Sequence, residues 1–333
     1  MQAMLLQAPA PVANQPLVLT AVPIPDLGDH DLLVRVRVCG VCHTDLHVVE
    51  GDLPLPKLPI VPGHQIVGVV ERTGAAVSRF RSGDRVGVPW LSSACGACDF
   101  CRRGQENLCD DARFTGYHVD GGFADYQVTD ERFAYRIPDS YGDLDAAPLL
   151  CAGVIGYRAL RLAGARDVSR LGLYGFGASA HLAIQVARHW GNEVYVFTRG
   201  DTHRRLAVEL GAVWTGSAGD DPGVPMDSSI IFAPAGALVP PALRALRKGG
   251  TLTLAGIHMS PIPELDYALL WGERVVRTVA NATRADAEEL LARAADLRLH
   301  TEVQSFPLAD ANEVLRRLAH SQIRGAAALR VSD

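Results

Sequence analysis

Four cysteines gathered in one short segment constrain this chain more than any other feature. The two-residue gaps between the first three let successive thiolates converge on one centre, and the longer spacer before the fourth lets the backbone close a tetrahedron. Four sulfur ligands leave no open coordination position, so we expect a structural zinc ion here. An iron–sulfur cluster and a disulfide-bonded knot are the alternatives, and neither explains the second ligand set described below. The four residues are Cys95, Cys98, Cys101 and Cys109.

The composition favours a two-domain protein that acts on a small molecule. The chain has 333 residues, of which 48% are hydrophobic, enough to bury a core in each of two domains. Its 32 Lys and Arg against 37 Asp and Glu give a net charge of −5, which provides no basic stripe for nucleic acid. No run of about 18 apolar residues marks a membrane span.

The amino-terminal segment and the cysteine count indicate a cytoplasmic protein. The first residues lack a charged segment followed by a long apolar one, so we expect no secretory signal. Seven cysteines, an odd number, are typical of reduced thiols. We therefore expect a cytoplasmic location.

Two patterns of secondary structure follow one another along the chain. From about residue 5 to 150, short β-branched runs between closely spaced turns predict a compact β domain, with strands at 32–38, 66–71 and 85–88. From about 153 to 283, apolar strands alternate with helical periodicity, which predicts βαβ units and a parallel sheet. The expected strands there are 171–174, 193–197, 229–233 and 250–255, and the expected helices are 178–190 and 203–210. Helices at 286–297 and 310–318 and a last strand at 327–331 complete the prediction.

A glycine-rich turn follows the first strand of the parallel sheet and opens its helix. This is the context that a dinucleotide-binding fingerprint needs: Gly175 permits the tight turn, and Gly177 lets the backbone approach a pyrophosphate. Ala178 and Ser179 begin the helix, whose positive end attracts phosphate, and Ala180 stands where a third small residue lets helix pack on strand. The alternative is a glycine turn that binds no ligand.

The residues after the second strand of this unit favour NADP(H) over NAD(H). An acidic residue some 20 positions past the glycines would bind the ribose hydroxyls of NAD, but the strand ends at Thr198. Arg199 follows directly, and further cations lie in the next helix. The alternative is that these are ordinary solvated charges at the start of a helix.

A third group of residues completes a pattern that resembles a known family. The segments Cys42-His43-Thr44-Asp45-Leu46-His47 and Gly63-His64-Gln65, followed by the four-cysteine lobe, Cys151 and the glycine turn, occur in the order typical of zinc-dependent alcohol dehydrogenases. The chain resembles this family, part of the medium-chain dehydrogenase/reductase superfamily, over essentially its whole length.

This resemblance implies the domain organisation. A GroES-like catalytic β domain is expected over residues 1–152, with the structural-zinc lobe at about 92–112. A Rossmann cofactor domain with a doubly wound parallel sheet is expected over 153–283. Residues 284–333 would return to the catalytic domain, so the fold class is α/β. Because relatives generally self-associate through the Rossmann sheet, we expect a homodimer or homotetramer.

The resemblance and the donor chemistry together imply a second zinc ion. Cys42, His64 and Cys151 would hold a catalytic zinc and leave its fourth position for the substrate oxygen, giving two zinc ions per chain. The alternative is that both cysteines and the histidine are core residues. Cys39, in contrast, is expected to be a small core residue.

Roles for further residues follow from the same resemblance. Thr44 would accept a hydrogen bond from the substrate hydroxyl and pass its proton by way of the cofactor ribose to His47, for which a surface histidine without a task is the alternative. Asp45 would orient the imidazole of His64, or would be an ordinary turn aspartate. His43 stands where relatives place a basic residue against the cofactor pyrophosphate. Trp90 would line the alcohol pocket and limit substrate bulk, or would belong to the core.

Three positions depart from the family pattern. Gln65 replaces a glutamate and removes an anionic carboxylate near the catalytic zinc. Arg324 is shifted from the position at which relatives contact the cofactor phosphates, so it is not counted as a cofactor residue. Pro234 is unusual in the segment that lines the far side of the nicotinamide in relatives.

The sequence therefore predicts a zinc-dependent alcohol dehydrogenase that transfers hydride reversibly between a small alcohol or aldehyde and NAD(P), with NADP(H) favoured. One alternative is a zinc-free enal or quinone reductase of the same superfamily. The other is a non-catalytic relative that binds zinc and nucleotide.

Overall fold

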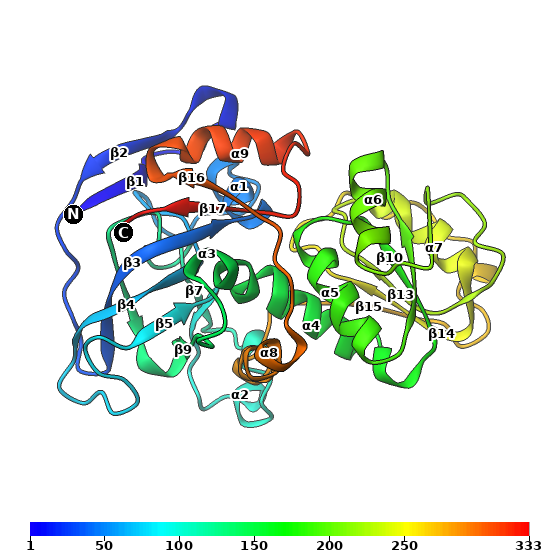
Figure 1. Cartoon of the computed structure of the whole chain (residues 1–333), viewed down its shortest axis with the longest axis horizontal. Helices are drawn as coiled ribbons and strands as arrows, with labels where there is room; N and C mark the ends of the chain where they lie inside the picture. Colours follow the sequence, from blue (N-terminus) through cyan, green and yellow to red (C-terminus); the bar gives the residue numbers. More distant parts are fainter. Residues whose placement is uncertain (333) are drawn as a thin grey trace. The chain divides into compact units, whose positions relative to one another are not determined.

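The computed structural model describes residues 1–332 and divides the chain into two compact units (Figure 1). The first unit comprises Met1–Cys151, Thr283–Asp296 and the residues from Thr301 onward. The second comprises Ala152–Ala282 and Leu297–His300. The chain thus leaves the first unit directly after Cys151 and returns to it at Thr283.

A seven-stranded sheet forms the centre of the first unit. Its order is β16-β17-β3-β4-β5-β9, with β8 also paired to β3, and all pairs except β16–β17 are antiparallel. Alternate residues Leu32, Val34 and Val36 enter the main core, as the period of a half-buried strand requires. The strands are β3 (Asp31–Val41), β4 (Gln65–Thr73), β5 (Arg85–Val88), β8 (Tyr126–Asp130), β9 (Tyr135–Arg136), β16 (Val303–Pro307) and β17 (Ala326–Arg330).

Two small sheets and five α-helices complete this unit. Strands β1 (Gln2–Leu6) and β2 (Leu17–Ala21) form one hairpin, and β6 (Leu91–Ser93) pairs with β7 (Arg113–Phe114) in the cysteine lobe. The helices are α1 (His43–Glu50), α2 (Asp99–Arg102), α3 (Asp143–Ala146), α8 (Arg284–Leu297) and α9 (Ala311–Ala319).

The second unit is built on a six-stranded parallel sheet of order β12-β11-β10-β13-β14-β15. In chain order this is 3-2-1-4-5-6, the arrangement of a doubly wound dinucleotide-binding fold. The strands are β10 (Arg170–Tyr174), β11 (Glu193–Phe197), β12 (Trp214–Gly216), β13 (Met226–Ile231), β14 (Leu246–Leu254) and β15 (Val275–Thr278). The helices are α4 (Ala152–Leu162), α5 (Ala178–His189), α6 (Asp201–Glu209) and α7 (Val239–Ala245).

The predicted fold class, an antiparallel β domain with a parallel α/β domain, is confirmed. The strand expected at 229–233 lies earlier, at Met226–Ile231, because Asp227, Ser228 and Ser229 are buried in β13 despite their polarity. The Ser228 hydroxyl donates to the carbonyl oxygens of Ala163 and Thr251, and Asp227 Oδ2 accepts the backbone N–H groups of Ser169 and Arg170. Strands β15 and β16 and helices α4 and α7 were not predicted.

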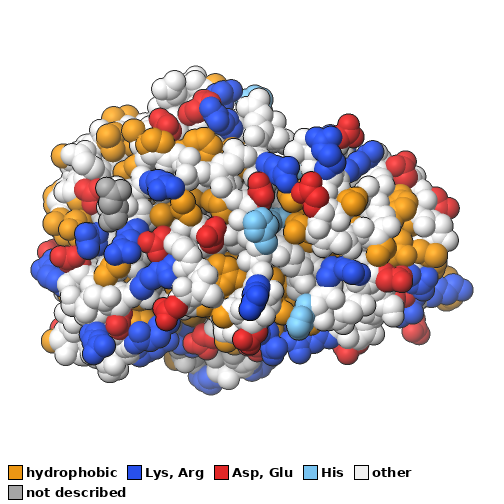
Figure 2. Space-filling view, viewed as in Figure 1, with side chains coloured by type: hydrophobic (Ala, Val, Ile, Leu, Met, Phe, Trp, Pro, Cys, Tyr) orange, Lys and Arg blue, Asp and Glu red, His pale blue; other side chains and the backbone are white. Residues whose placement is uncertain are grey.

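No helix among residues 1–332 combines the length and hydropathy needed to cross a membrane. The face shown in Figure 2 carries both signs of charge interspersed, without a continuous basic stripe.

Candidate active site

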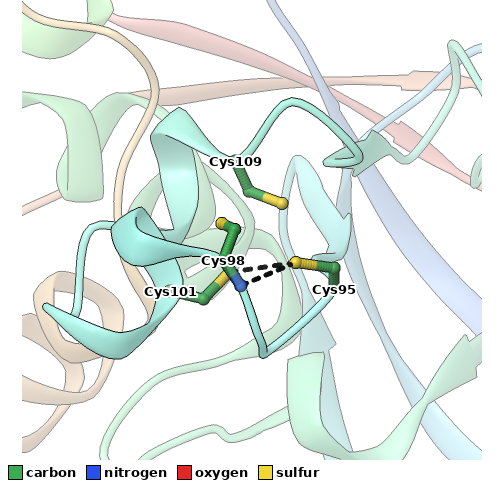
Figure 3. A group of neighbouring side chains, drawn as sticks. All are labelled: Cys95, Cys98, Cys101 and Cys109. Atoms are coloured by element: carbon green, nitrogen blue, oxygen red, sulfur yellow. Dashed lines mark hydrogen bonds between the residues drawn. The ribbon is translucent and has the colours of Figure 1, made fainter.

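The four lobe cysteines lie together around α2 (Figure 3). Their sulfur atoms all lie within 4.8 Å of one another, and Cys95 Sγ is 3.9 Å from Cys101 Sγ. Thiolates bound tetrahedrally to one zinc ion at about 2.3 Å are separated by about 3.8 Å. The donor set therefore fits a closed four-sulfur zinc site.

Backbone hydrogen bonds favour the thiolate form of Cys95. The N–H groups of Ala97 and Cys98 donate to Cys95 Sγ at 3.4 and 3.3 Å. These bonds, with a further contribution from Cys109, lower the pKa of Cys95 to about 6. A thiolate is the form that binds metal, so the turn between Cys95 and Cys98 prepares a ligand near neutral pH.

A second donor set joins Cys42, His64 and Cys151. Cys42 is the residue before α1, His64 precedes β4, and Cys151 ends the first stretch of the first unit. His64 Nε2 lies 3.4 Å from each sulfur, and the two sulfurs are 3.9 Å apart. Tetrahedral zinc with ligand bonds of about 2.1 to 2.3 Å gives ligand separations of about 3.6 to 3.8 Å, so these residues fit a three-ligand zinc site.

Asp45 fixes the orientation of His64 within this set. Its Oδ1 lies 2.9 Å from His64 Nδ1 and accepts the N–H of Gly63 at 3.2 Å, while Oδ2 accepts the N–H of Cys42 at 2.9 Å. With the Nδ1 proton donated to the carboxylate, the lone pair of Nε2 faces the two sulfurs. One buried aspartate therefore holds two of the three donors in place.

The electrostatics of the set favour a positive charge at Nε2. Burial opposes protonation of His64, but Asp45 and then Cys42 outweigh it and raise the pKa of His64 to about 10. A hydrogen bond from Cys151 lowers the pKa of Cys42 and raises that of Cys151. Burial raises the pKa of Asp45. The same negative surroundings would favour a metal cation at this position.

The glycine turn of the second unit has the shape of a phosphate cradle. Gly175 has a φ of +84°, and a Cβ there would lie 2.9 Å from the Cβ of Ala233, so only glycine fits this turn. A Cβ at Gly177 would meet no atom within 4 Å, which leaves the amino-terminal end of α5 open. No acidic residue or side-chain cap occupies that end, while Ala180 is fully buried. The open end of α5 is suited to an anion.

Comparisons with known proteins show the family to which the chain belongs. Residues 28–139 match the alcohol dehydrogenase GroES-like domain. The chain is 46% identical to the probable alcohol dehydrogenase AdhA of Mycobacterium tuberculosis, over 99% of this chain and 97% of that protein. An alcohol dehydrogenase of Geobacillus stearothermophilus is 38% identical over 96% of this chain and 97% of its own length. The chain belongs to the medium-chain alcohol dehydrogenase family. It is therefore an oxidoreductase that acts on an alcohol or aldehyde.

Solved structures of this family share the whole fold. A cinnamyl alcohol dehydrogenase of Sorghum bicolor matches with a TM-score of 0.91 and 29% identity, covering 99% of this chain and 98% of that chain. A zinc-binding dehydrogenase of Sinorhizobium meliloti 1021, bound to NADP, matches with a TM-score of 0.87 and 26% identity, covering 99% of each chain. The non-catalytic alternative is disfavoured, because the named relatives are enzymes.

The other residues to which the family resemblance gives a role near the catalytic zinc have defined positions. Thr44 and His47 are buried on α1, and His43 begins that helix. The ring of Trp90 meets His64 edge-on at 4.9 Å, and Trp90 is partly buried. Gln65 is buried at the start of β4. The structure thus brings Trp90 beside the candidate metal ligand His64, while the catalytic roles of these residues stay predictions.

The cofactor positions after the glycine turn are also defined. Thr198 is buried directly after β11, and Arg199 beside it is exposed. Arg204 donates to the Thr198 carbonyl oxygen at 3.2 Å and to Ser217 Oγ at 2.8 Å. Ala178 and Ser179 lie in the first turn of α5. Arg199 is therefore the cation beside Thr198 that is exposed for a ligand.

Two features near the metal-ligand set were not predicted. Asp52 lies 2.7 Å from His47, and Phe114 and Tyr117 pack against Trp90 with ring centroids 5.2 and 5.7 Å away. Asp52 follows His47 by five residues, so the local sequence placed it nearby, but no periodic pattern marked it. Cys39 is buried in the core as expected, and Arg324 pairs with Glu302 at 3.4 Å.

Proposed function

We propose that this protein is a zinc-dependent alcohol dehydrogenase that prefers NADP(H), with one catalytic and one structural zinc ion per chain. The observation that carries the proposal is the convergence of Cys42, His64 and Cys151, with Asp45 bonded to the far nitrogen of the imidazole. Three donors leave one position open, as a catalytic zinc requires, whereas the four lobe sulfurs leave none.

The mechanism assigns each residue a separate task. Cys42, His64 and Cys151 would hold the catalytic ion, which supplies Lewis acidity to the alcohol oxygen while the nicotinamide carries the hydride. Thr44 would accept a hydrogen bond from the substrate hydroxyl, and His47 would deliver the released proton to water. Asp45 keeps His64 in the required tautomer through the 2.9 Å contact with its Nδ1.

The aromatic residues beside the ligand set support a small substrate. Trp90 lies edge-on to His64 and stacks on Phe114 with an interplanar angle of 12°, so its ring is fixed by neighbours on two sides. A fixed indole limits the bulk that can approach the metal position. We therefore propose small alcohols and aldehydes as substrates, with Trp90→Ala expected to widen the range toward larger ones.

The preference for NADP(H) is supported by charge and by one relative. No carboxylate ends β11, whereas Arg199 lies next to Thr198 with an exposed side chain, suited to a 2′-phosphate. The structure of the Sinorhizobium meliloti dehydrogenase is described as bound to NADP. Initial rates with NADPH and NADH test this preference, and Arg199→Gln should lower kcat/KM for NADPH about tenfold while changing that for NADH little. Equal use of both cofactors by the parent enzyme would contradict the preference.

The zinc-free reductase alternative makes a different prediction. If zinc is required, removing it with a chelator should abolish oxidation of ethanol or butanol, and added Zn²⁺ should restore it. Activity that survives complete removal of the metal from the Cys42, His64 and Cys151 set would favour the zinc-free reductase instead.

The edge of the parallel sheet supports self-association. All four residues of β15 are exposed, and Val275 and Val276 are 48% and 37% exposed at the sheet edge. An exposed edge strand leaves backbone N–H and C=O groups unpaired, and these can pair with another copy. We propose a homodimer or homotetramer, which the molar mass from light scattering tests, and Val276→Lys should shift it toward the monomer. A cytoplasmic location stays a prediction.

A further inference from the structure

A cavity of about 340 Å³ lies in the first unit, lined by residues other than the candidate zinc ligands. Three lining residues, Glu288, Leu291 and Ala292, share one face of α8 because they follow one another at helical spacing. Strand β9 lines the cavity with Tyr135 and Arg136. The volume is within the range of small-molecule sites. The remaining lining residues are Arg79, Phe80, Ile137 and Pro138.

The cavity contains one cation and one anion that make no ion pair with the described residues. Arg136 pairs with Asp84 at 3.2 Å. Within residues 1–332, the guanidinium of Arg79 and the carboxylate of Glu288 make no ion pair with an oppositely charged side chain. The Arg79 guanidinium donates to the backbone oxygen of Glu131, and Arg79 and Glu288 are both exposed to solvent. The two charges of opposite sign are therefore both available to a ligand.

Tyr135 supplies a further polar group to the cavity. Tyr135 is only 3% exposed, and its hydroxyl makes no hydrogen bond with the described residues. Burial, and then the nearby charge of Glu288, raise the pKa of Tyr135, so the hydroxyl keeps its proton and can donate. The hydroxyl oxygen is accessible to solvent, so a ligand in the cavity can reach it.

The other wall of the cavity is apolar. Phe80, Ile137 and Leu291 are each less than a tenth exposed and line the same space. The guanidinium of Arg79 lies over the ring of Phe80, with its central carbon 5.4 Å from the ring centroid. The Phe80 ring therefore contacts the Arg79 guanidinium at the cavity wall, and the edge of the same ring gives the cavity an apolar surface.

We propose that this cavity is a second binding site, for a small zwitterion with an apolar body, such as an aromatic amino acid. The carboxylate of the ligand would bind Arg79, its ammonium group would bind Glu288, and Tyr135 would donate to the carboxylate. Its side chain would lie against Phe80 and Leu291. The proposal is independent of the zinc and cofactor assignments.

Calorimetric titration of the purified enzyme with L-phenylalanine tests this site. We expect saturable binding of one molecule per chain. 3-Phenylpropionate and 2-phenylethylamine, which lack the ammonium and the carboxylate respectively, should bind at least about tenfold more weakly because each leaves one charge of the cavity unpaired. No saturable binding of L-phenylalanine up to its solubility limit would overturn the proposal.

Matched variants locate the binding. Arg79→Gln and Glu288→Gln should each weaken L-phenylalanine about tenfold, and Tyr135→Phe about fivefold. Arg132→Gln is the control, because Arg132 is exposed, pairs with Asp130 at 2.6 Å and does not line the cavity. If Arg79→Gln does not fold, Glu288→Gln and Tyr135→Phe decide the question. Binding that none of these variants changes would place the ligand elsewhere and refute the proposal.

Alcohol turnover separates this proposal from the proposed function. Tyr135→Phe should keep the parent rate of alcohol oxidation in the absence of L-phenylalanine while its affinity for the amino acid falls. If the zinc assignment is wrong, the alcohol turnover will differ from the one predicted above, but L-phenylalanine will still bind to the cavity.

Discussion

The Nδ1 atom of His47 lies 2.7 Å from Oδ2 of Asp52, the first aspartate after the end of α1. The contact fixes the plane of the imidazole and the nitrogen that carries the proton, and the backbone N–H of Asp52 also donates to the carbonyl oxygen of His47 at 3.0 Å. If His47 delivers protons to water, Asp52 is its positioning residue.

Replacing Asp52 therefore tests the proposed proton path. Asp52→Asn should lower kcat for alcohol oxidation about three- to tenfold at neutral pH, with a smaller effect on KM, because the imidazole loses its oriented acceptor. Steady-state rates across pH measure this, and the solvent isotope effect should rise. Asp29→Asn, an exposed change elsewhere in the same unit, is the control. An unchanged pH profile in Asp52→Asn would remove Asp52 from the path.

Loss of the hydrogen bond between Asp45 and His64 should lower the affinity for zinc without unfolding the protein. Asp45→Asn keeps a side chain of the same shape but removes the charge that orients His64, so zinc affinity at this site should fall about 10- to 100-fold. Competition with a chromogenic chelator measures the affinity. Asp52→Asn should retain the parent affinity, and equal affinities in Asp45→Asn and the parent would show that the contact does not support the metal.

Glu106 connects the cysteine lobe to α8. Its buried carboxylate accepts both the backbone N–H and Nε of Arg284, at 2.9 and 3.2 Å, and Arg284 also lies over the ring of Phe133. Glu106→Gln should destabilise the protein by about 1 kcal/mol, because the buried carboxylate loses a charge-assisted bond to a guanidinium that is itself 44% exposed and therefore partly screened by solvent. Chemical denaturation measures the change.

The control for Glu106 is an exposed carboxylate with similar partners. Glu313 contacts Arg316 and Arg317 at 2.7 and 2.8 Å on the surface of α9, where solvent screens the pair. Glu313→Gln should therefore change stability much less than Glu106→Gln. Equal losses of stability in the two variants would argue against a stabilising contact between Glu106 and α8.

Asp227 predicts a pH-dependent stability of the second unit. Burial opposes its ionisation, but the backbone N–H groups of Arg170 and Ser169 and the guanidinium of Arg247 outweigh burial and hold the pKa of Asp227 below its ordinary value. Because the folded pKa is lowered, the stabilisation is present above the ordinary pKa of about 3.9 and is lost as pH falls through the folded value.

Asp227→Asn should therefore lower Tm by about 2 to 8 °C at pH 7. The difference from the parent should shrink as the pH falls below about 4, where the parent carboxylate also becomes protonated. Calorimetric scans of both proteins from pH 3 to pH 7 measure it. A difference that stays constant over this range would show that the charge of Asp227 is not what stabilises the sheet.

Local patterns in the sequence predicted much of the fold. The β-branched run at 32–38 marked β3, and the apolar run followed by Gly175 and Gly177 marked β10 and the turn before α5. The four lobe cysteines were also recognisable together because they are close in the chain. The residues that form each of these elements are close together in the sequence, so a local pattern is enough to predict them.

Structure that depends on distant contacts was harder to predict. Cys42 and Cys151 are 109 positions apart, so only the family resemblance, and no spacing rule, placed them at one centre. Helix α4 contains Gly156, which weakens a helical pattern, but a Cβ there would lie 3.1 Å from the Ser179 oxygen and 3.3 Å from the Ala183 side chain. Glycine thus permits close packing of α4 on α5, at the cost of its helical propensity.

The short edge strands and the second cavity had the weakest sequence patterns. β15 is exposed at every residue, so it lacks the alternation that marks a half-buried strand. The cavity joins Tyr135 on β9 to Glu288 on α8, two residues that become neighbours only when the carboxy-terminal part of the chain returns to the first unit.

The zinc content of the purified protein tests the central claim most directly. Plasma mass spectrometry on protein prepared without chelator or added zinc should give about two zinc ions per chain, falling to about one in Cys98→Ser, from loss of the lobe ion, and to about one in His64→Ala. His64→Ala should also abolish alcohol oxidation. One zinc ion per chain in the parent, lost in Cys98→Ser and unchanged in His64→Ala, would leave the set of Cys42, His64 and Cys151 without metal and contradict the account.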